Sequence, residues 1–205
     1  MATPPASLPP QLSRHSGALR ALLLGLVVAI TAPAFADDLA DALRLSRRGE
    51  YPQALERLDA HLRQSPNDAQ ALFTKGVVLT EAGRTDEAIA VFTKVTEDFP
   101  EMPESYNNLA VLYAREGLYE RARMALEMAI RAHPSYATAH ENLGDIYVTL
   151  ASQSYGKAVQ LDANSRTART KLTLSRDLLA VQPKAKPAPA PEERAQPAEP
   201  AGARQ

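Results

Sequence analysis

The chain has 205 residues, a formal net charge of −1 at pH 7 and no cysteine. Without cysteine it has no disulfide, no thiol nucleophile and no acylated cysteine of the lipoprotein kind. Its charge is balanced and no basic patch with interleaved aromatic residues occurs, so the sequence carries no electrostatic footprint for nucleic acid.

The N-terminal segment has the layout of a secretory signal peptide. Arg20 precedes a short apolar run at residues 21–30, and a small-residue box with the sequence Ala-Phe-Ala follows at 34–36. A basic region, a short apolar region and such a box mark a cleavable signal. We therefore predict that residues 1–36 are removed and that the mature chain begins at Asp37. The alternative is an uncleaved inner-membrane signal anchor, although the run is shorter than the roughly 20 residues that a spanning helix needs.

Three sets of residues recur at a spacing of 34 positions, a length that indicates stacked structural repeats. Each set has a physical reason. The glycines fall where a helix ends and the chain reverses, which often needs a left-handed backbone. The alanines allow two helices to cross closely, and the prolines end the second helix. The sets are Gly49, Gly83 and Gly117; Ala54, Ala88 and Ala122; and Pro66, Pro100 and Pro134.

The residues between these markers resemble the tetratricopeptide repeat. The second repeat supplies the family's pattern with Leu72, Gly76, Leu79, Ala88, Phe92 and Pro100. The third supplies it with Tyr106, Leu109, Ala110, Tyr113, Ala122, Leu126 and Pro134. The resemblance implies an all-α fold, a right-handed α-solenoid of three to four helix–turn–helix units with a C-terminal capping helix. Lys75 departs from the pattern, because the family usually has leucine at its place.

The repeat register divides the predicted solenoid, residues 37–181, into units. The fourth unit lacks the turn glycine, so it is either two helices joined by a very short turn near Ser152 or one long helix over residues 137–161. The spacing of its apolar residues slightly favours the single helix. The predicted units are 37–68, 69–102, 103–136 and 137–164, followed by a cap at 165–181.

The C-terminal segment, residues 182–205, is almost entirely Pro, Ala and charged residues. It has too little apolar surface to form a core, so we predict a disordered tail with extended polyproline character. Such a tail is either a plain solvated segment or a tether or docking motif.

No pattern for catalysis, a cofactor or a metal is present. The phosphate-binding and dinucleotide-binding glycine motifs and the serine-hydrolase motif are all missing. His140 and Glu141 begin like a zinc-protease motif, but Gly144 stands where the second histidine is required. We predict neither an enzyme nor a cofactor, and we expect His61 and His140 to be packing or rim residues.

The resemblance also implies where a partner binds, because the first helices of such units line a concave groove. The groove positions lack the Lys and Arg residues with which some relatives grip a C-terminal carboxylate, so we expect no ligand of that kind. The residues predicted to contact a partner are Phe73, Val77, Asn107, Asn108, Val111, Arg115, Glu141, Asn142 and Asp145.

Two functions from different classes fit these observations. The first is a non-catalytic scaffold or adaptor of the bacterial periplasm that holds another envelope protein or an extended segment in its groove. The second is a structural spacer, or a self-associating envelope protein, tethered through the tail. Neither involves nucleic acid or stable membrane insertion after signal cleavage, and the sequence does not set the oligomeric state.

Overall fold

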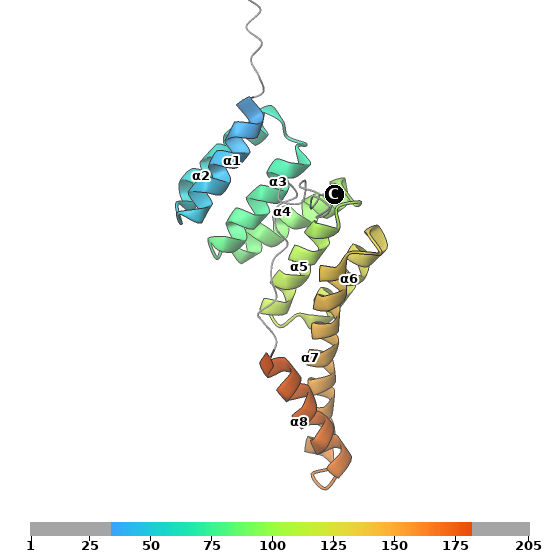
Figure 1. The fold of residues 1–205 in the computed structure, drawn as a ribbon. Helices are drawn as coiled ribbons and strands as arrows, with labels where there is room; N and C mark the ends of the chain where they lie inside the picture. The colour runs from blue at the N-terminus through green and yellow to red at the C-terminus, as the bar shows by residue number, and fades with distance from the viewer. Residues whose placement is uncertain (1–33, 182–205) are drawn as a thin grey trace, which may run out of the picture. The chain divides into compact units, whose positions relative to one another are not determined.

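The computed structural model describes residues 34–181, so the predicted tail and nearly all of the predicted signal segment lie outside the described residues. Within this range the chain forms eight α-helices and no strand (Figure 1). Their bounds are α1 (Ala34–Arg47), α2 (Tyr51–Gln64), α3 (Ala69–Glu81), α4 (Thr85–Asp98), α5 (Pro103–Arg115), α6 (Tyr119–Ala132), α7 (Ala137–Leu161) and α8 (Arg166–Val181).

Each helix packs mainly against the helices next to it in the sequence. The hairpin pairs are α1 with α2, α3 with α4, α5 with α6 and α7 with α8, and each second helix also contacts the first helix of the next pair. We call α1, α3, α5 and α7 the A helices, and α2, α4 and α6 the B helices. The A helices touch one another as well, α1 with α3 and α5 with α7. This arrangement confirms the expected all-α solenoid of helix–turn–helix units.

The predicted turn glycines have the left-handed backbone that the turn requires. Gly49, Gly83 and Gly117 have φ angles of 77°, 73° and 74°, and no other described residue has a positive φ. At Gly83 the turn is closed by two backbone hydrogen bonds, from the Arg84 amide to the Leu79 carbonyl at 2.9 Å and from the Gly83 amide to the Thr80 carbonyl at 3.2 Å. These bonds satisfy carbonyl groups at the end of α3 that have no partner within the helix.

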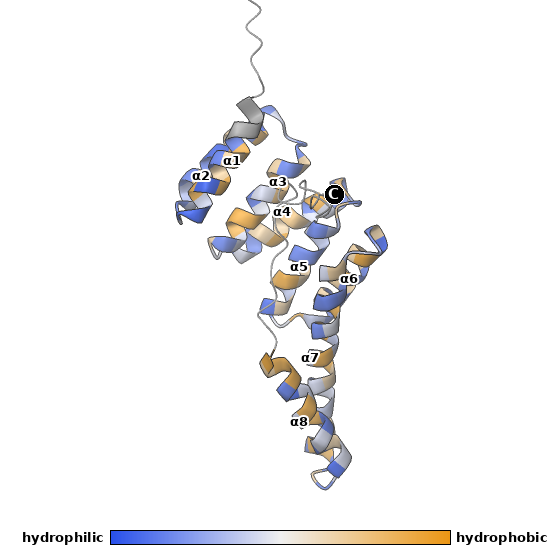
Figure 2. Cartoon of the chain, in the orientation of Figure 1, coloured by the Kyte–Doolittle hydropathy of each residue, from blue (hydrophilic) through white to orange (hydrophobic). Residues whose placement is uncertain are grey.

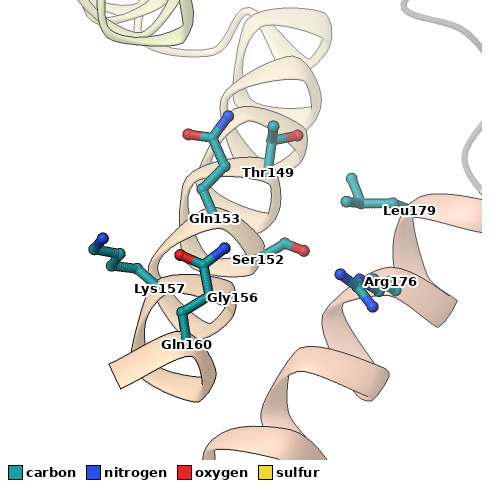
Figure 3. A pocket seen from close by; sticks show the side chains of 8 residues that line it. All are labelled: Thr149, Ser152, Gln153, Gly156, Lys157, Gln160, Arg176 and Leu179. Atoms are coloured by element: carbon teal, nitrogen blue, oxygen red, sulfur yellow. The ribbon is translucent and has the colours of Figure 1, made fainter. Parts of the chain in front are cut away.

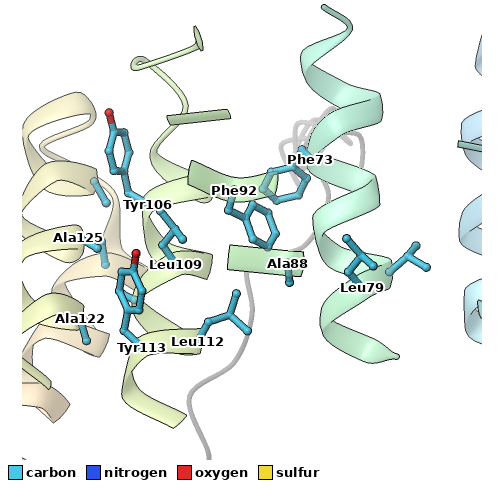
Figure 4. Packing of buried hydrophobic residues seen from close by; sticks show 14 of the residues in the cluster. Phe73, Leu79, Ala88, Phe92, Tyr106, Leu109, Leu112, Tyr113, Ala122 and Ala125 are labelled. Atoms are coloured by element: carbon cyan, nitrogen blue, oxygen red, sulfur yellow. The ribbon is translucent and has the colours of Figure 1, made fainter. Parts of the chain in front are cut away.

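The centre of the second unit is a pair of phenylalanines closed over a glycine. Phe73 of α3 and Phe92 of α4 are both 0% exposed, and their rings meet edge to face with centroids 5.5 Å apart (Figure 4). The Phe92 ring lies directly over Gly76, where a Cβ atom would stand 2.7 Å from two ring carbons. The repeat alanines Ala54, Ala88 and Ala122 are likewise 0% exposed, which confirms their role at the helix crossings.

Lys75 replaces an apolar contact with an ion pair between helices. Its ammonium group donates a hydrogen bond to the carboxylate of Asp59 on α2 at 2.6 Å. The bond joins α3 to the preceding unit at the place where the family usually has leucine, and the Lys75 side chain is 27% exposed.

The fourth unit is built differently from the others. α7 continues without a break from Ala137 to Leu161, which is the single helix that the apolar spacing favours. α8 folds back along its second half and takes the place of a B helix. Several apolar side chains of α8 stay exposed, among them Leu174, Leu178 and Val181. Figure 2 shows that α8 carries several hydrophobic, orange segments.

The start of α3 is held by an aspartate with two partners. Asp68 is the N-cap and accepts a hydrogen bond from the Ala71 amide at 3.0 Å, while its other oxygen lies 2.7 Å from Nε2 of the buried His61. Partial burial would raise the pKa of the Asp68 carboxyl. The hydrogen bonds from Ala71 and His61 outweigh burial and hold that pKa below its ordinary value.

We expect Asp68→Ala to lower the free energy of unfolding by about 1–2 kcal/mol at pH 7, because it removes a cap. Asp68→Asn keeps the cap and should cost less. Since the folded-state pKa is depressed, the carboxylate's contribution is present above the unfolded value of about 3.9 and is lost as the pH falls through the folded value. Urea unfolding at several pH values measures this. If the difference in free energy of unfolding between the parent and Asp68→Asn persists at low pH, the charge of Asp68 is not the source of that difference.

Candidate partner-binding surface

Most of the predicted contact residues share one face of their A helix. Asn108, Val111 and Arg115 on α5 are spaced three and four residues apart, and Glu141 and Asp145 on α7 are four apart. We call this side of α3, α5 and α7 the A-face. Asn107 and Asn142 are sequence neighbours of these residues and lie about 100° around the helix from them.

The structure separates the predicted residues by burial. Five of them are buried: Phe73, Asn107, Asn108, Val111 and Asn142. Val77 and Asp145 are half-buried, whereas Arg115 and Glu141 are exposed. Phe73 and Asn107 are 0% exposed, so these two side chains support the A-face from within. The residues available to a partner are therefore Val77, Arg115, Glu141 and Asp145.

A buried amide pair joins the third and fourth units. Asn142 donates a hydrogen bond from Nδ2 to Oδ1 of Asn107 at 2.7 Å. Ser46 and Glu81 make a similar side-chain hydrogen bond between the first and second units. The Nδ2 group of Asn107 is buried and has no hydrogen-bond acceptor. An unmet buried donor costs free energy, and because Asn107 is 0% exposed, a partner lying on the surface does not reach this atom.

The exposed part of the A-face is predominantly acidic. Glu81, Glu104, Glu141 and Asp145 lie along it, with Arg115 as the basic exception. Burial raises the pKa of the Asp145 carboxyl, and the negative charge of Glu141 one turn away raises it further. A positively charged group bound beside Asp145 would lower this pKa again.

The B-helix side carries an apolar hollow that the sequence reasoning missed. It has a volume of about 230 Å³ and is lined mainly by Tyr106, Leu109 and Tyr113 of α5 and Met124 and Met128 of α6. Arg121 covers one end, with its guanidinium carbon 4.1 Å from the centroid of the Tyr113 ring. The feature of the sequence that could have indicated this hollow is the four-residue spacing of Met124 and Met128, which places both on the outward face of α6.

A second, more polar hollow of about 450 Å³ lies between α7 and α8. Figure 3 shows Leu179 and Arg176 of α8 facing Thr149 and Ser152 of α7 across it. Thr149 follows Asp145 by one helical turn on the same face, so the end of α8 lies beside the end of the A-face.

The histidine and acidic side chains of residues 34–181 are dispersed. No group of three or more His, Asp or Glu side chains in this range is arranged to hold a metal ion. None of the helices there is long and apolar enough to cross a membrane. His61 is buried against Asp68, and His140 is exposed with Nε2 2.9 Å from the Pro134 carbonyl oxygen.

The chain belongs to the tetratricopeptide repeat family. The family's sequence profile matches residues 39–103, 81–137 and 107–163, which together span more than half of the chain. Proteins of this fold are interaction scaffolds that present an extended surface to other proteins.

Curated relatives are similar over part of the chain. A chloroplastic tetratricopeptide repeat domain-containing protein of Arabidopsis thaliana, PYG7, is 27% identical over 63% of this chain and 46% of its own length. Subunit 2-A of the ER membrane protein complex of Xenopus laevis is 26% identical over 70% of this chain and 51% of its own length. The chain thus spans about half the length of these relatives.

Solved structures share the fold. MamA (residues 41 to end) of Desulfovibrio magneticus RS-1 matches with a TM-score of 0.53 and 24% identity, covering 73% of this chain and 97% of that one. The type III secretion chaperone SycD of Yersinia enterocolitica, in complex with a peptide of the translocator YopD, matches with a TM-score of 0.53 and 16% identity. That match covers 59% of this chain and 98% of SycD.

Proposed function

We propose that this protein is a non-catalytic interaction scaffold of the bacterial periplasm that holds an extended segment of a partner protein on its A-face. The observation that carries the proposal is the A-face itself. Buried side chains hold its helices in place from within, and Val77, Arg115, Glu141 and Asp145 remain accessible on it.

Rigidity favours such a role. The Asn142–Asn107 hydrogen bond joins α7 to α5 and the Ser46–Glu81 bond joins α1 to α3, which favours a surface that is largely formed before a partner arrives. A pre-formed surface spares the ordering cost of binding, and an extended segment supplies backbone groups along its whole length. SycD, a structure of the same fold, is described in complex with a peptide, which is consistent with this mode of binding.

The test exchanges charges on the two sides of the solenoid. We expect Arg115→Glu and Glu141→Lys to weaken binding of a partner, identified by cross-linking in the envelope, by about tenfold each, which corresponds to about 1.4 kcal/mol. Arg57→Glu and Glu120→Lys are matched controls, because both residues are exposed on B helices and carry the same charges. Titration calorimetry with the purified partner gives the affinities, and thermal melts check that all four variants are folded.

Loss of binding in the B-helix variants with no change in the A-face variants would contradict groove capture. The apolar hollow at Tyr113 and Met124 would then be the contact site. A chain that binds no partner but sediments as an oligomer would favour the alternative, a structural or self-associating envelope protein, for which the exposed leucines of α8 are the supporting observation.

The periplasmic location rests on the signal-like layout of residues 1–36. Mass spectrometry of the protein purified from its own cells is expected to find Asp37 as the first residue. An intact leader in the membrane fraction would instead indicate an inner-membrane anchor.

A further inference from the structure

α7 and α8 run antiparallel in a register that can be followed residue by residue. Leu172 lies 4.0 Å from the position that a Cβ atom of Gly156 would take, and the ammonium group of Lys171 lies 5.5 Å from the ring centroid of Tyr155. Nearer the end of α8, Leu179 shares a hollow with Thr149 (Figure 3). Residues later in α8 therefore pack against residues earlier in α7, which lie nearer to Asp145 and Glu141.

By this register the end of α8 at Val181 lies beside the part of α7 that carries its acidic residues. Asp145 and Glu141 precede Thr149 by one and two helical turns, about 6 and 12 Å along the helix at about 1.5 Å per residue. Lys184 and Lys186 follow Val181 by three and five residues, or about 9 and 16 Å at about 3.1 Å per residue in an extended chain. The two lysines can thus reach the two carboxylates.

The sequence of this segment also suits the surface. Residues 182–191 contain both lysines and no acidic residue, while the A-face carries Glu81, Glu104, Glu141 and Asp145. The prolines of the segment favour the polyproline II conformation, whose backbone carbonyls have no internal hydrogen-bond partner. The whole segment 182–205 could extend on the order of 70 Å, more than three adjacent A helices at about 10 Å spacing require.

We propose that residues 182–191 of the chain's own C-terminal segment dock along the A-face in cis, with Lys184 and Lys186 over Asp145 and Glu141 and the proline-rich backbone crossing α5. This inference rests on the proposed function, because it assigns an occupant to the same surface. A partner then has to displace the segment, and its apparent affinity is reduced by the fraction of molecules in which the A-face is already occupied.

The experiment uses the whole chain. Because there is no native cysteine, Ala188→Cys accepts a single nitroxide label. We expect the label to broaden the NMR amide signals of Val77, Val111 and Glu141 on the A-face. It should spare Glu56 and Glu120 on the B helices.

Two charge reversals give a matched comparison. Lys184→Glu/Lys186→Glu should lower the ratio of docked to undocked chains by about tenfold, since attraction at two sites becomes repulsion. Lys157→Glu/Arg166→Glu makes the same change in net charge at exposed positions of α7 and α8 away from Asp145, and should leave the broadening as it is.

Equal broadening of both sides of the solenoid, or none, would overturn the proposal. Broadening that arises only when nitroxide-labelled molecules are mixed with unlabelled, isotopically enriched ones would also overturn it. The occupant of the A-face would then be the tail of a second copy of the chain. If A-face substitutions abolish binding of an external partner while the label leaves the A-face unaffected, the proposed function stands and this inference fails. If the label shows docking in cis but no partner depends on the A-face for binding, this inference stands and the proposed function fails.

Discussion

Phe92→Ala is expected to lower the free energy of unfolding by about 3–5 kcal/mol, the range for removing a buried aromatic ring from a core. The ring is 0% exposed, packs edge to face on Phe73 and covers Gly76, so its removal leaves a cavity between α3 and α4. Such a loss is a large part of the total stability of an ordinary domain. Urea unfolding followed by circular dichroism measures it, and Phe99→Ala, a half-buried residue at the end of the same helix, should cost much less.

Gly76 provides the decisive control for this packing. Gly76→Ala in the parent chain should cost about 1–3 kcal/mol, because its methyl group would overlap the Phe92 ring. In a Phe92→Leu background the same change should cost little, since the shorter side chain leaves room and alanine is the better helix former. Additive effects of the two substitutions would mean that the two residues are not in contact, contrary to the structure.

Gly83→Val is expected to cost about 1–3 kcal/mol through backbone strain alone. With φ at 73°, Gly83 has a backbone that a β-branched residue adopts only at high cost, although no atom lies within 4 Å of where its Cβ would be. The loss should therefore appear even though there is space for the side chain. Thermal melts or urea titrations give the value.

A matched alanine substitution separates conformation from space. Gly144 also has nothing within 4 Å of where a Cβ atom would stand, but it lies inside α7 with ordinary helical geometry. Gly83→Ala should destabilise the protein, whereas Gly144→Ala should stabilise it by about 0.5–1 kcal/mol. The same sign at both positions would show that the turn at Gly83 does not need a left-handed residue.

The candidate site was predictable in part. The repeat register placed the predicted contact residues on the A helices, and their role in partner binding stays a prediction. It did not reveal which of them are accessible: Phe73, Asn107 and Val111 are buried, whereas Arg115 and Glu141 face solvent. The hollow formed by Tyr113 and Met124 was missed because its residues come from neighbouring helices, and helical periodicity describes one helix at a time.

Local chemistry along the chain determines the repeats of this protein. A glycine at each turn, a small residue at each crossing and a proline after each B helix act within a few residues of where they stand, so their pattern is legible in the sequence. The depth of each A-face side chain, the Asn142–Asn107 bond and the return of α8 along α7 depend on how closely successive helices approach one another. That approach is set by packing between residues that are 16 to 35 positions apart, such as Lys171 with Tyr155 and Asn142 with Asn107, and only the tertiary structure decides it.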